Sequence, residues 1–359
     1  MPIISESKVC DIRYLYNTFY DIERPILEIG YIFLATLSRF ALQNLLLDKR
    51  YLKGIKCLKG RFALLPVTET LSKDEVIDAL TSVGATELML RNQHAAIQAV
   101  SCAAEQISEG ARAMADAIRG QGSLVYAAAG SSGLMALADA SELTGTFGIE
   151  QSRIQIHMPG GVPVDARMPG DTEDNIDFAQ VASNEIKPAD AVIVLSASGT
   201  TPYALAVARA AKLKGARVIA IANNANTPLL GSADVGICLE TPPEVIAGST
   251  RLGAGTAQKV ALNLMSSQMG IELGHVYQGQ MVNVIADNAK LKKRAEEMVA
   301  RIAGVTVDSA RNALTQAGGG TKLAILVAKG CDLPAAQVLL STHEGHLGPC
   351  LKELKSIKT

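Results

Sequence analysis

Hydroxyl side chains gather in two short turns, each placed where an apolar run gives way to a helical pattern. The first turn, 130–133, follows the run 123–129, and the second, 196–201, follows the run 192–195. The hydroxyl residues are Ser131 and Ser132 in the first turn, and Ser196, Ser198, Thr200 and Thr201 in the second. A helix N-terminus has free backbone N–H groups and a partial positive charge, which suits a phosphate. Alternatively the hydroxyls only cap the helices, but the repeated pattern favours a shared phosphate site.

Carboxylates near these turns are the candidates for moving protons. Glu142 lies one helix length after the first turn, in DASELTGTFG (139–148), and Glu173 lies in GDTEDN (170–175). Abstraction of a proton beside a carbonyl needs a base, and expulsion of a leaving group needs an acid. Two carboxylates in different surroundings can divide these roles. The alternative for each is an ordinary solvated helix charge.

Metal chemistry finds little support in the sequence. His343 and His346, in STHEGHLG (341–348), are three residues apart, but no further ligands stand out, so we expect structural or substrate-contact histidines and no metal. The six cysteines are scattered and none forms a CxxC pair, which favours idle thiols in a reducing cytoplasm.

Several function classes are disfavoured. The chain has neither a GxGxxG loop followed by an acidic residue nor a GxxxxGK[ST] loop, which argues against dinucleotide and nucleoside triphosphate sites. A formal net charge of −1 provides no broad basic field for nucleic acid or a membrane surface. We expect the lysine cluster at 290–294 to be a solvated helix face.

Alternating elements are expected to position these groups. Strands are predicted at 123–129, 153–158, 192–195, 217–223 and 235–239. Helices are predicted at 72–90 (capped by Ser72), 94–119, 172–185 and 250–270. This alternation predicts an α/β fold with a doubly wound, five-stranded parallel sheet and helices on both faces. Loops at the carboxyl ends of its strands can meet over one crevice.

Composition divides the chain into three parts. Residues 1–65 hold nine of the fourteen Phe and Tyr residues, and form either an extension of unknown role or a start assigned too early. Their longest fairly apolar piece, 26–37, carries Glu28 and is too short to span a bilayer. We expect a sugar-phosphate domain at 66–280 and a small helical domain at 281–359.

These motifs, in this order, resemble the N-acetylmuramic acid 6-phosphate etherases, which are sugar-isomerase (SIS) domain proteins. The matching pieces are AAAGSSGLMALADASELTGTFG (127–148), GDTEDN (170–175), SASGTTPY (196–203), GSTRLGAGTAQKVALNLMS (248–266) and VNVIADNAKLKKR (282–294). The resemblance extends from about residue 66 to the C-terminus, and GAGTAQK with the preceding STR is its most specific part.

The resemblance implies a homodimer with its active site at the subunit interface, and a lyase reaction without a cofactor, as in cell-wall sugar recycling. The open-chain sugar would lose its C2 proton, D-lactate would leave from C3, and water would add to give N-acetylglucosamine 6-phosphate. The resemblance places the general-acid role on Glu142 and the second catalytic role on Glu173, with the 6-phosphate on the hydroxyl turns.

Basic residues usual in the family are missing at three positions, which hold Leu134, Thr200 and Gly253. A charge-assisted contact is worth about 1.5–3 kcal/mol, so the substrate could lack the lactyl carboxylate. Two alternatives therefore stay open: an aldose–ketose sugar-phosphate isomerase, and a non-catalytic sugar-phosphate-binding regulator. The presence of both Glu142 and Glu173 favours catalysis.

Overall fold

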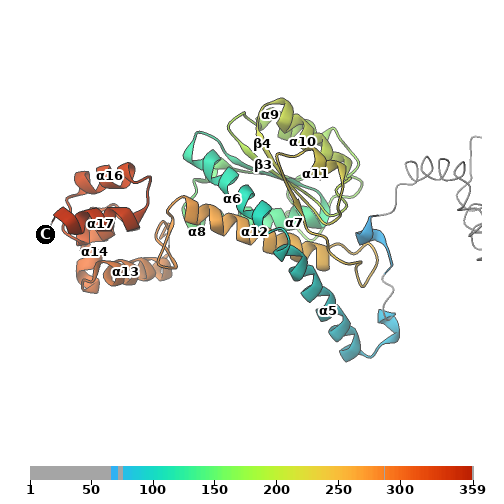
Figure 1. Ribbon diagram of the computed structural model, residues 1–359, viewed down its shortest axis with the longest axis horizontal. Coiled ribbons are helices and arrows are strands. Elements are labelled where there is room, and N and C mark those ends of the chain that lie inside the picture. Colours follow the sequence, from blue (N-terminus) through green and yellow to red (C-terminus); the bar gives the residue numbers. More distant parts are fainter. Residues whose placement is uncertain (1–65, 72–75, 287, 358–359) are drawn as a thin grey trace, which may run out of the picture. The chain divides into compact units, whose positions relative to one another are not determined.

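Five parallel strands form the central sheet of the computed structural model, in the order β2-β1-β3-β4-β5 (Figure 1). The strands are β1 (Leu124–Ala128), β2 (Ile154–His157), β3 (Ala191–Ser196), β4 (Arg217–Ala222) and β5 (Val235–Cys238). The structure describes residues 66–71, 76–286 and 288–357. Each predicted strand is present and the predicted doubly wound parallel sheet is confirmed.

The position of each strand in the sheet explains its sequence pattern. β1 and β3 are buried on both faces, and both read as continuous apolar or small runs, as central parallel strands do. They pair in parallel with Leu124 opposite Ala191. β5, at the edge, alternates buried and half-buried residues instead. The carboxyl ends of β1 and β3 therefore lie next to each other.

Helices cover both faces of the sheet (Figure 1). One face carries α5 (Ser82–Ser101), α6 (Ala104–Arg119), α7 (Gly130–Ala140), α8 (Leu143–Phe147) and α12 (Gly253–Glu272). The other carries α9 (Phe178–Glu185), α10 (Pro202–Leu213) and α11 (Pro228–Ser232). Two apolar clusters, one on each side, hold these layers together. Such a two-sided core is what a doubly wound fold requires.

The predicted helix at 94–119 is wrong as a single helix. α5 ends at Ser101 and α6 begins at Ala104, although both pack on α12. Because both helices bury apolar residues against the same neighbour, the spacing of those residues continues across the break. Spacing alone could not reveal the break. Gly120 ends α6, as predicted.

Two other helix predictions need correction. The helix expected at 72–90 begins only at Ser82. The Thr81 side chain caps it, because its Oγ1 accepts from the backbone N–H of Gly84. Residues 72–75 lie outside the described part of the chain. The helix expected at 172–185 begins only at Phe178. Glu173 instead lies on a loop, where its carbonyl accepts from the backbone N–H of Tyr203 rather than from a helical neighbour.

The C-terminal region is helical, as predicted. After a short hairpin of β6 (Val276–Tyr277) and β7 (Gln280–Met281) come α13 (Ala289–Ala303), α14 (Val307–Gln316), α15 (Thr321–Ala328), α16 (Leu333–Thr342) and α17 (Leu347–Ile357). They share a third apolar cluster. The lysine cluster on α13 is exposed. The boundary expected near residue 280 stays a prediction.

No single helix among the described residues is long and apolar enough to cross a membrane; by length and composition alone, the bent pair α15 and α16 passes that test. Both predictions about residues 1–65 lie outside the described residues.

Candidate active site

The strand order reverses between β1 and β3, and the two hydroxyl turns follow these two strands. The chain leaves β1 toward β2 on one side, and leaves β3 toward β4 on the other. Ligands of open α/β sheets bind at such a switch point, outside the carboxyl ends of the strands. We name residues 129–133 loop 1 and residues 196–201 loop 2. Because β1 and β3 pair in parallel, the fold places these two loops next to each other at the carboxyl edge of the sheet.

Loop 2 is a connected group of hydroxyls. Ser196 Oγ lies 2.8 Å from Thr201 Oγ1 and 3.3 Å from Ser198 Oγ. Thr200 Oγ1 donates to Ser198 Oγ at 2.9 Å, and the Gly199 N–H donates to Ser196 Oγ at 3.0 Å. The loop is thus fixed by its own side chains before α10 begins, and its hydroxyls can turn to donate to an anion.

Loop 1 is tied to a distant segment of the chain. Ser131 Oγ lies 3.2 Å from Thr250 Oγ1, in the segment that leads into α12. Ser132 is buried, with 6% of its surface exposed. Both serines belong to the first turn of α7, whose N–H groups have no acceptor within the helix. Loop 1 therefore offers backbone donors and one half-buried hydroxyl.

Glu173 connects the start of α7 with the start of α10. Its Cδ atom lies 3.4 Å from the point where a Cβ atom would stand on Gly130, and its Oε1 is nearer still. Its own carbonyl accepts from the N–H of Tyr203 at the start of α10, 3.2 Å away. Gly130 has a φ of 55°, which favours glycine. The carboxylate therefore lies over the start of α7 while its backbone is held at the start of α10.

The pKa of Glu173 is raised above its usual value. Partial burial is the largest cause, followed by the negative charges of Asp174 and Glu69. Each cause disfavours the ionised carboxylate. A carboxyl group perturbed in this way is typical of a proton-transferring residue.

A short 3-10 helix, η2 (Val67–Glu69), also lies at the carboxyl edge of the sheet. Its position was not predicted from the sequence. Asn224, just after β4, donates from Nδ2 to Thr68 Oγ1 at 3.1 Å and to the Ala197 carbonyl of loop 2 at 2.8 Å. The N–H of Gly248 donates to the Thr68 carbonyl at 3.2 Å. In the sequence, the adjacent Asn223 and Asn224 directly after β4 were the feature that could have indicated a polar contact at this edge.

The N-terminus of α12 is already neutralised from within the chain. The backbone N–H groups of Gly253 and Ala254 each donate to the Glu244 carboxylate at 2.9 Å. Glu244 is 1% exposed, and burial raises its pKa while these two bonds lower it. Since this carboxylate takes the anion position at α12, the starts of α7 and α10 are the helix N-termini left for a phosphate.

Glu142 lies at the other end of α7 from loop 1. It is exposed, and the eleven residues of α7 separate it from Glu173 by about 16 Å along the helix axis. Within one chain the structure does not bring the two glutamates together. Asp139, from the same motif, is 3% exposed and accepts from Tyr126 Oη and Ser266 Oγ, both at 3.0 Å. That carboxylate holds α7 to β1 and α12.

The remaining marked residues are spread over the fold. Thr200 is exposed on loop 2, and Leu134 is half-buried in α7. Gly253 is buried. His343 Nε2 lies 2.7 Å from Glu353 Oε2, and His346 Nε2 lies 3.1 Å from the Glu272 carbonyl, so each ring has its own protein partner.

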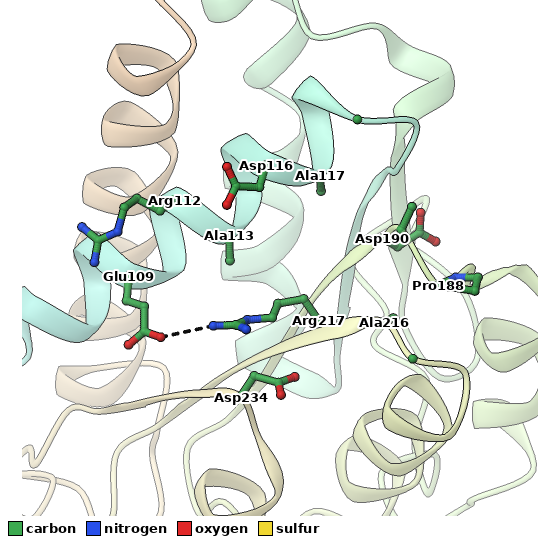
Figure 2. Close-up of a pocket in the computed structure, with 13 residues that line it drawn as sticks. Glu109, Arg112, Ala113, Asp116, Ala117, Pro188, Asp190, Ala216, Arg217 and Asp234 are labelled. Atoms are coloured by element: carbon green, nitrogen blue, oxygen red, sulfur yellow. Dashed lines mark hydrogen bonds and ion pairs between the residues drawn. The ribbon is translucent and has the colours of Figure 1, made fainter.

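A pocket of about 780 Å³ opens at the opposite edge of the sheet, at the amino ends of β3 and β4 (Figure 2). Glu109 and Arg217 face each other there, 3.2 Å apart. Asp234 is paired with Lys212 at 2.5 Å, and Asp190 accepts from the Ser123 N–H at 2.8 Å. Because these charges already have protein partners, the edge of the sheet that carries loops 1 and 2 is the better candidate for the site.

Comparisons with known proteins show which sequences and folds this chain is similar to. A family model described as the SIS domain matches residues 90–223. An N-acetylmuramic acid 6-phosphate etherase from Deinococcus radiodurans is 38% identical over 294 residues, covering 81% of this chain and 93% of that protein. One from Geobacillus thermodenitrificans is 36% identical, covering 78% of this chain and 96% of that protein. Among solved structures, a phosphoheptose isomerase from Francisella tularensis is similar with a TM-score of 0.39 and 19% identity, covering 54% of this chain and 100% of that chain.

Proposed function

The chain belongs to the N-acetylmuramic acid 6-phosphate etherase family, and from this premise we propose that it cleaves the lactyl ether of N-acetylmuramic acid 6-phosphate. It is an enzyme of the lyase type that acts on a sugar phosphate. Overall, the ether and one water give N-acetylglucosamine 6-phosphate and D-lactate.

One observation carries the assignment of the site: the Glu173 carboxylate lies over loop 1 while its backbone is bonded to the start of α10. A sugar 6-phosphate held by loop 2 would present its other end to this carboxylate. We assign phosphate binding to the hydroxyls of both loops. These residues are Ser131, Ser132, Ser196, Ser198, Thr200 and Thr201.

We assign to Glu173 the removal of the C2 proton from the open-chain sugar. Loss of this proton and expulsion of lactate from C3 leave an unsaturated aldehyde, to which water adds at C3. A base is most effective when its pKa approaches the working pH, and the pKa of Glu173 is raised by burial, Asp174 and Glu69. The protonated carboxyl can return its proton when water adds.

The general-acid role of Glu142 requires a second copy of the chain. A two-fold axis perpendicular to α7 would place the end of one α7 beside the start of the other. The partner's exposed Glu142 could then protonate the leaving lactate. Val83, Leu90 and Ile97 give α5 an exposed apolar stripe at seven-residue spacing, with exposures of 68%, 53% and 44%. This exposed stripe supports a homodimer, because a partner subunit would remove it from water.

A hexosamine phosphate without the lactyl carboxylate is the second candidate substrate, and aldose–ketose isomerisation is the second candidate reaction. The exposed Thr200 favours them, because loop 2 carries no cation for a second anionic group. We also propose a cytoplasmic location, which cell fractionation would test; recovery outside the cytoplasm would contradict it.

The deciding experiment is D-lactate release from N-acetylmuramic acid 6-phosphate by the purified full-length chain. We expect release by the natural chain and none by Glu173→Gln. If no lactate appears while the chain interconverts an aldose and a ketose phosphate, the isomerase is supported and the etherase is not. Binding of the sugar phosphate without either reaction would support a regulator.

A further inference from the structure

The carboxyl edge of the sheet holds an acidic side chain that the proposed mechanism does not use. η2 places Glu69 there, with its Oε2 3.0 Å from the point where a Cβ atom would stand on Gly248. Glu69 is exposed, and among the described residues its carboxylate forms no ion pair. Its position is nevertheless firmly specified by its neighbours in η2.

Three contacts fix η2 against the site. Asn224 Oδ1 accepts from the Val67 N–H at 2.6 Å, and Asn224 Nδ2 donates to Thr68 Oγ1 at 3.1 Å. The Gly248 N–H donates to the Thr68 carbonyl at 3.2 Å. Thr68 is fully buried. Because Asn224 also holds loop 2, and the segment after Gly248 holds loop 1 through Thr250, η2 is attached to both hydroxyl loops.

The charges around Glu173 come from few elements. Asp171 and Asp174 lie on its own loop, Glu69 lies on η2, and Arg251 follows Thr250. Loop 2 and the first turn of α7 carry no charged residue. Glu69 and Asp174 are the two that raise the pKa of Glu173. A like charge makes a neighbouring carboxylate hold its proton more tightly, and so makes it a stronger base.

We propose that Glu69 is a positioning residue of the site, a fixed negative charge that acts through Glu173 and strengthens it as a base. This inference rests on the proposed function for the identity of the reaction. It adds a third carboxylate, from a segment far from Glu173 in the sequence, which touches no reacting atom.

The test is the pH dependence of kcat/KM for D-lactate release, compared between the natural chain, Glu69→Gln and Glu105→Gln. Glu105 is an exposed glutamate at the start of α6, outside the site, and serves as the matched control. We expect Glu69→Gln to move the acidic limb to lower pH by about half a unit and to lower the plateau by about twofold. Glu69→Asp, which keeps the charge, should restore most of the natural profile, and Glu105→Gln should leave the profile unchanged.

A second measurement does not depend on activity. Carbon-13 NMR follows the titration of the Glu173 carboxyl, whose signal is identified by its loss in Glu173→Gln. Its midpoint should fall in Glu69→Gln and stay in Glu105→Gln. An unchanged midpoint in Glu69→Gln, with the protein folded, would overturn the role of Glu69. Absence of D-lactate release from the natural chain would instead overturn the proposed reaction, and the NMR titration would still decide on Glu69.

Discussion

The carboxylate of Glu173 occupies the space in which a side chain on Gly130 would begin. Gly130 also has a positive φ of 55°, so two independent features require glycine at the start of α7. The contact joins the loop after β2 to the loop after β1, at the point where the strand order reverses. It is the most direct link between a candidate catalytic group and a candidate phosphate loop.

The first prediction concerns Gly130→Ala. The added methyl group should displace the Glu173 carboxylate and lower kcat about 100-fold, because misplacement of a catalytic group by about 1 Å can have that effect. The positive φ should also cost about 1 kcal/mol of stability. D-lactate release and urea unfolding measure the two effects separately.

Gly304→Ala is the matched control for this variant. Gly304 has a φ of 68°, but a Cβ atom there would meet nothing within 4 Å. It should therefore lose similar stability and keep its activity. Full activity in Gly130→Ala would contradict the placement of Glu173.

The second prediction concerns the separation of Glu142 from Glu173 along α7. If each site takes Glu142 from the partner subunit, neither Glu142→Gln nor Glu173→Gln alone should release D-lactate. Mixed dimers of the two variants should regain activity, because one of their two sites then has both glutamates intact. Purified differently tagged heterodimers should show about half the activity of the natural dimer, since one site of two is complete.

Homodimers of Glu142→Gln, which carry two intact Glu173 residues and no Glu142, provide the baseline for this experiment. If both glutamates of a site came from one chain, every site in the mixed dimer would lack one of them. An inactive heterodimer would therefore place both in the same chain and would require α7 to rearrange.

The hydroxyl loops could be predicted from the sequence because each is a local feature. An apolar strand, a small-residue turn and a helix start within a few residues need no information from elsewhere in the chain. Neighbouring positions for loops 1 and 2 then follow from a parallel sheet. The sequence could also mark Glu173, but it placed that residue at a helix start.

The long-range contacts could not be predicted in this way. Glu173 is positioned by a bond to Tyr203 and a contact with Gly130, and Thr68 is held by a residue 156 positions away. No local pattern encodes such contacts. Nor could spacing show that Asp139 points into the core while the exposed Glu142 lies a helix length from loop 1.

The third prediction concerns His275, whose Nδ1 is buried without a hydrogen-bond partner in the described part of the chain. Burial, together with the nearby charges of Lys322 and His346, lowers the pKa of this histidine to about 3, although the Phe147 backbone opposes the shift. The unfolded chain takes up this proton near pH 6.5, and the folded chain does not. Stability is thus fully present above pH 6.5 and falls as the pH drops toward 3, by up to about 5 kcal/mol.

Urea unfolding at pH 7, 5.5 and 4.5 tests this dependence. His275→Gln should flatten the fall in unfolding free energy across these values. His94→Gln, at an exposed position on α5, should keep the fall of the natural chain. Equal slopes for the natural chain and His275→Gln would show that another group causes the acid sensitivity.

The last prediction concerns the positions at which a basic residue is missing. Thr200 is exposed on loop 2, so Thr200→Arg can direct a guanidinium at an anionic substrate. We expect kcat/KM for N-acetylmuramic acid 6-phosphate to rise about tenfold, mainly through KM, as one charge-assisted contact would give. Thr200→Ala separates this gain from loss of the bond to Ser198.

Gly253→Lys should give no such gain, because a Cβ atom there would stand 2.8 Å from Asn92 Oδ1 and 3.2 Å from Glu244 Oε2. A lysine there would point toward α5 and pair with Glu244, which would loosen the cap of α12. A gain in Gly253→Lys without one in Thr200→Arg would place the second anionic group of the substrate beside α12 rather than loop 2.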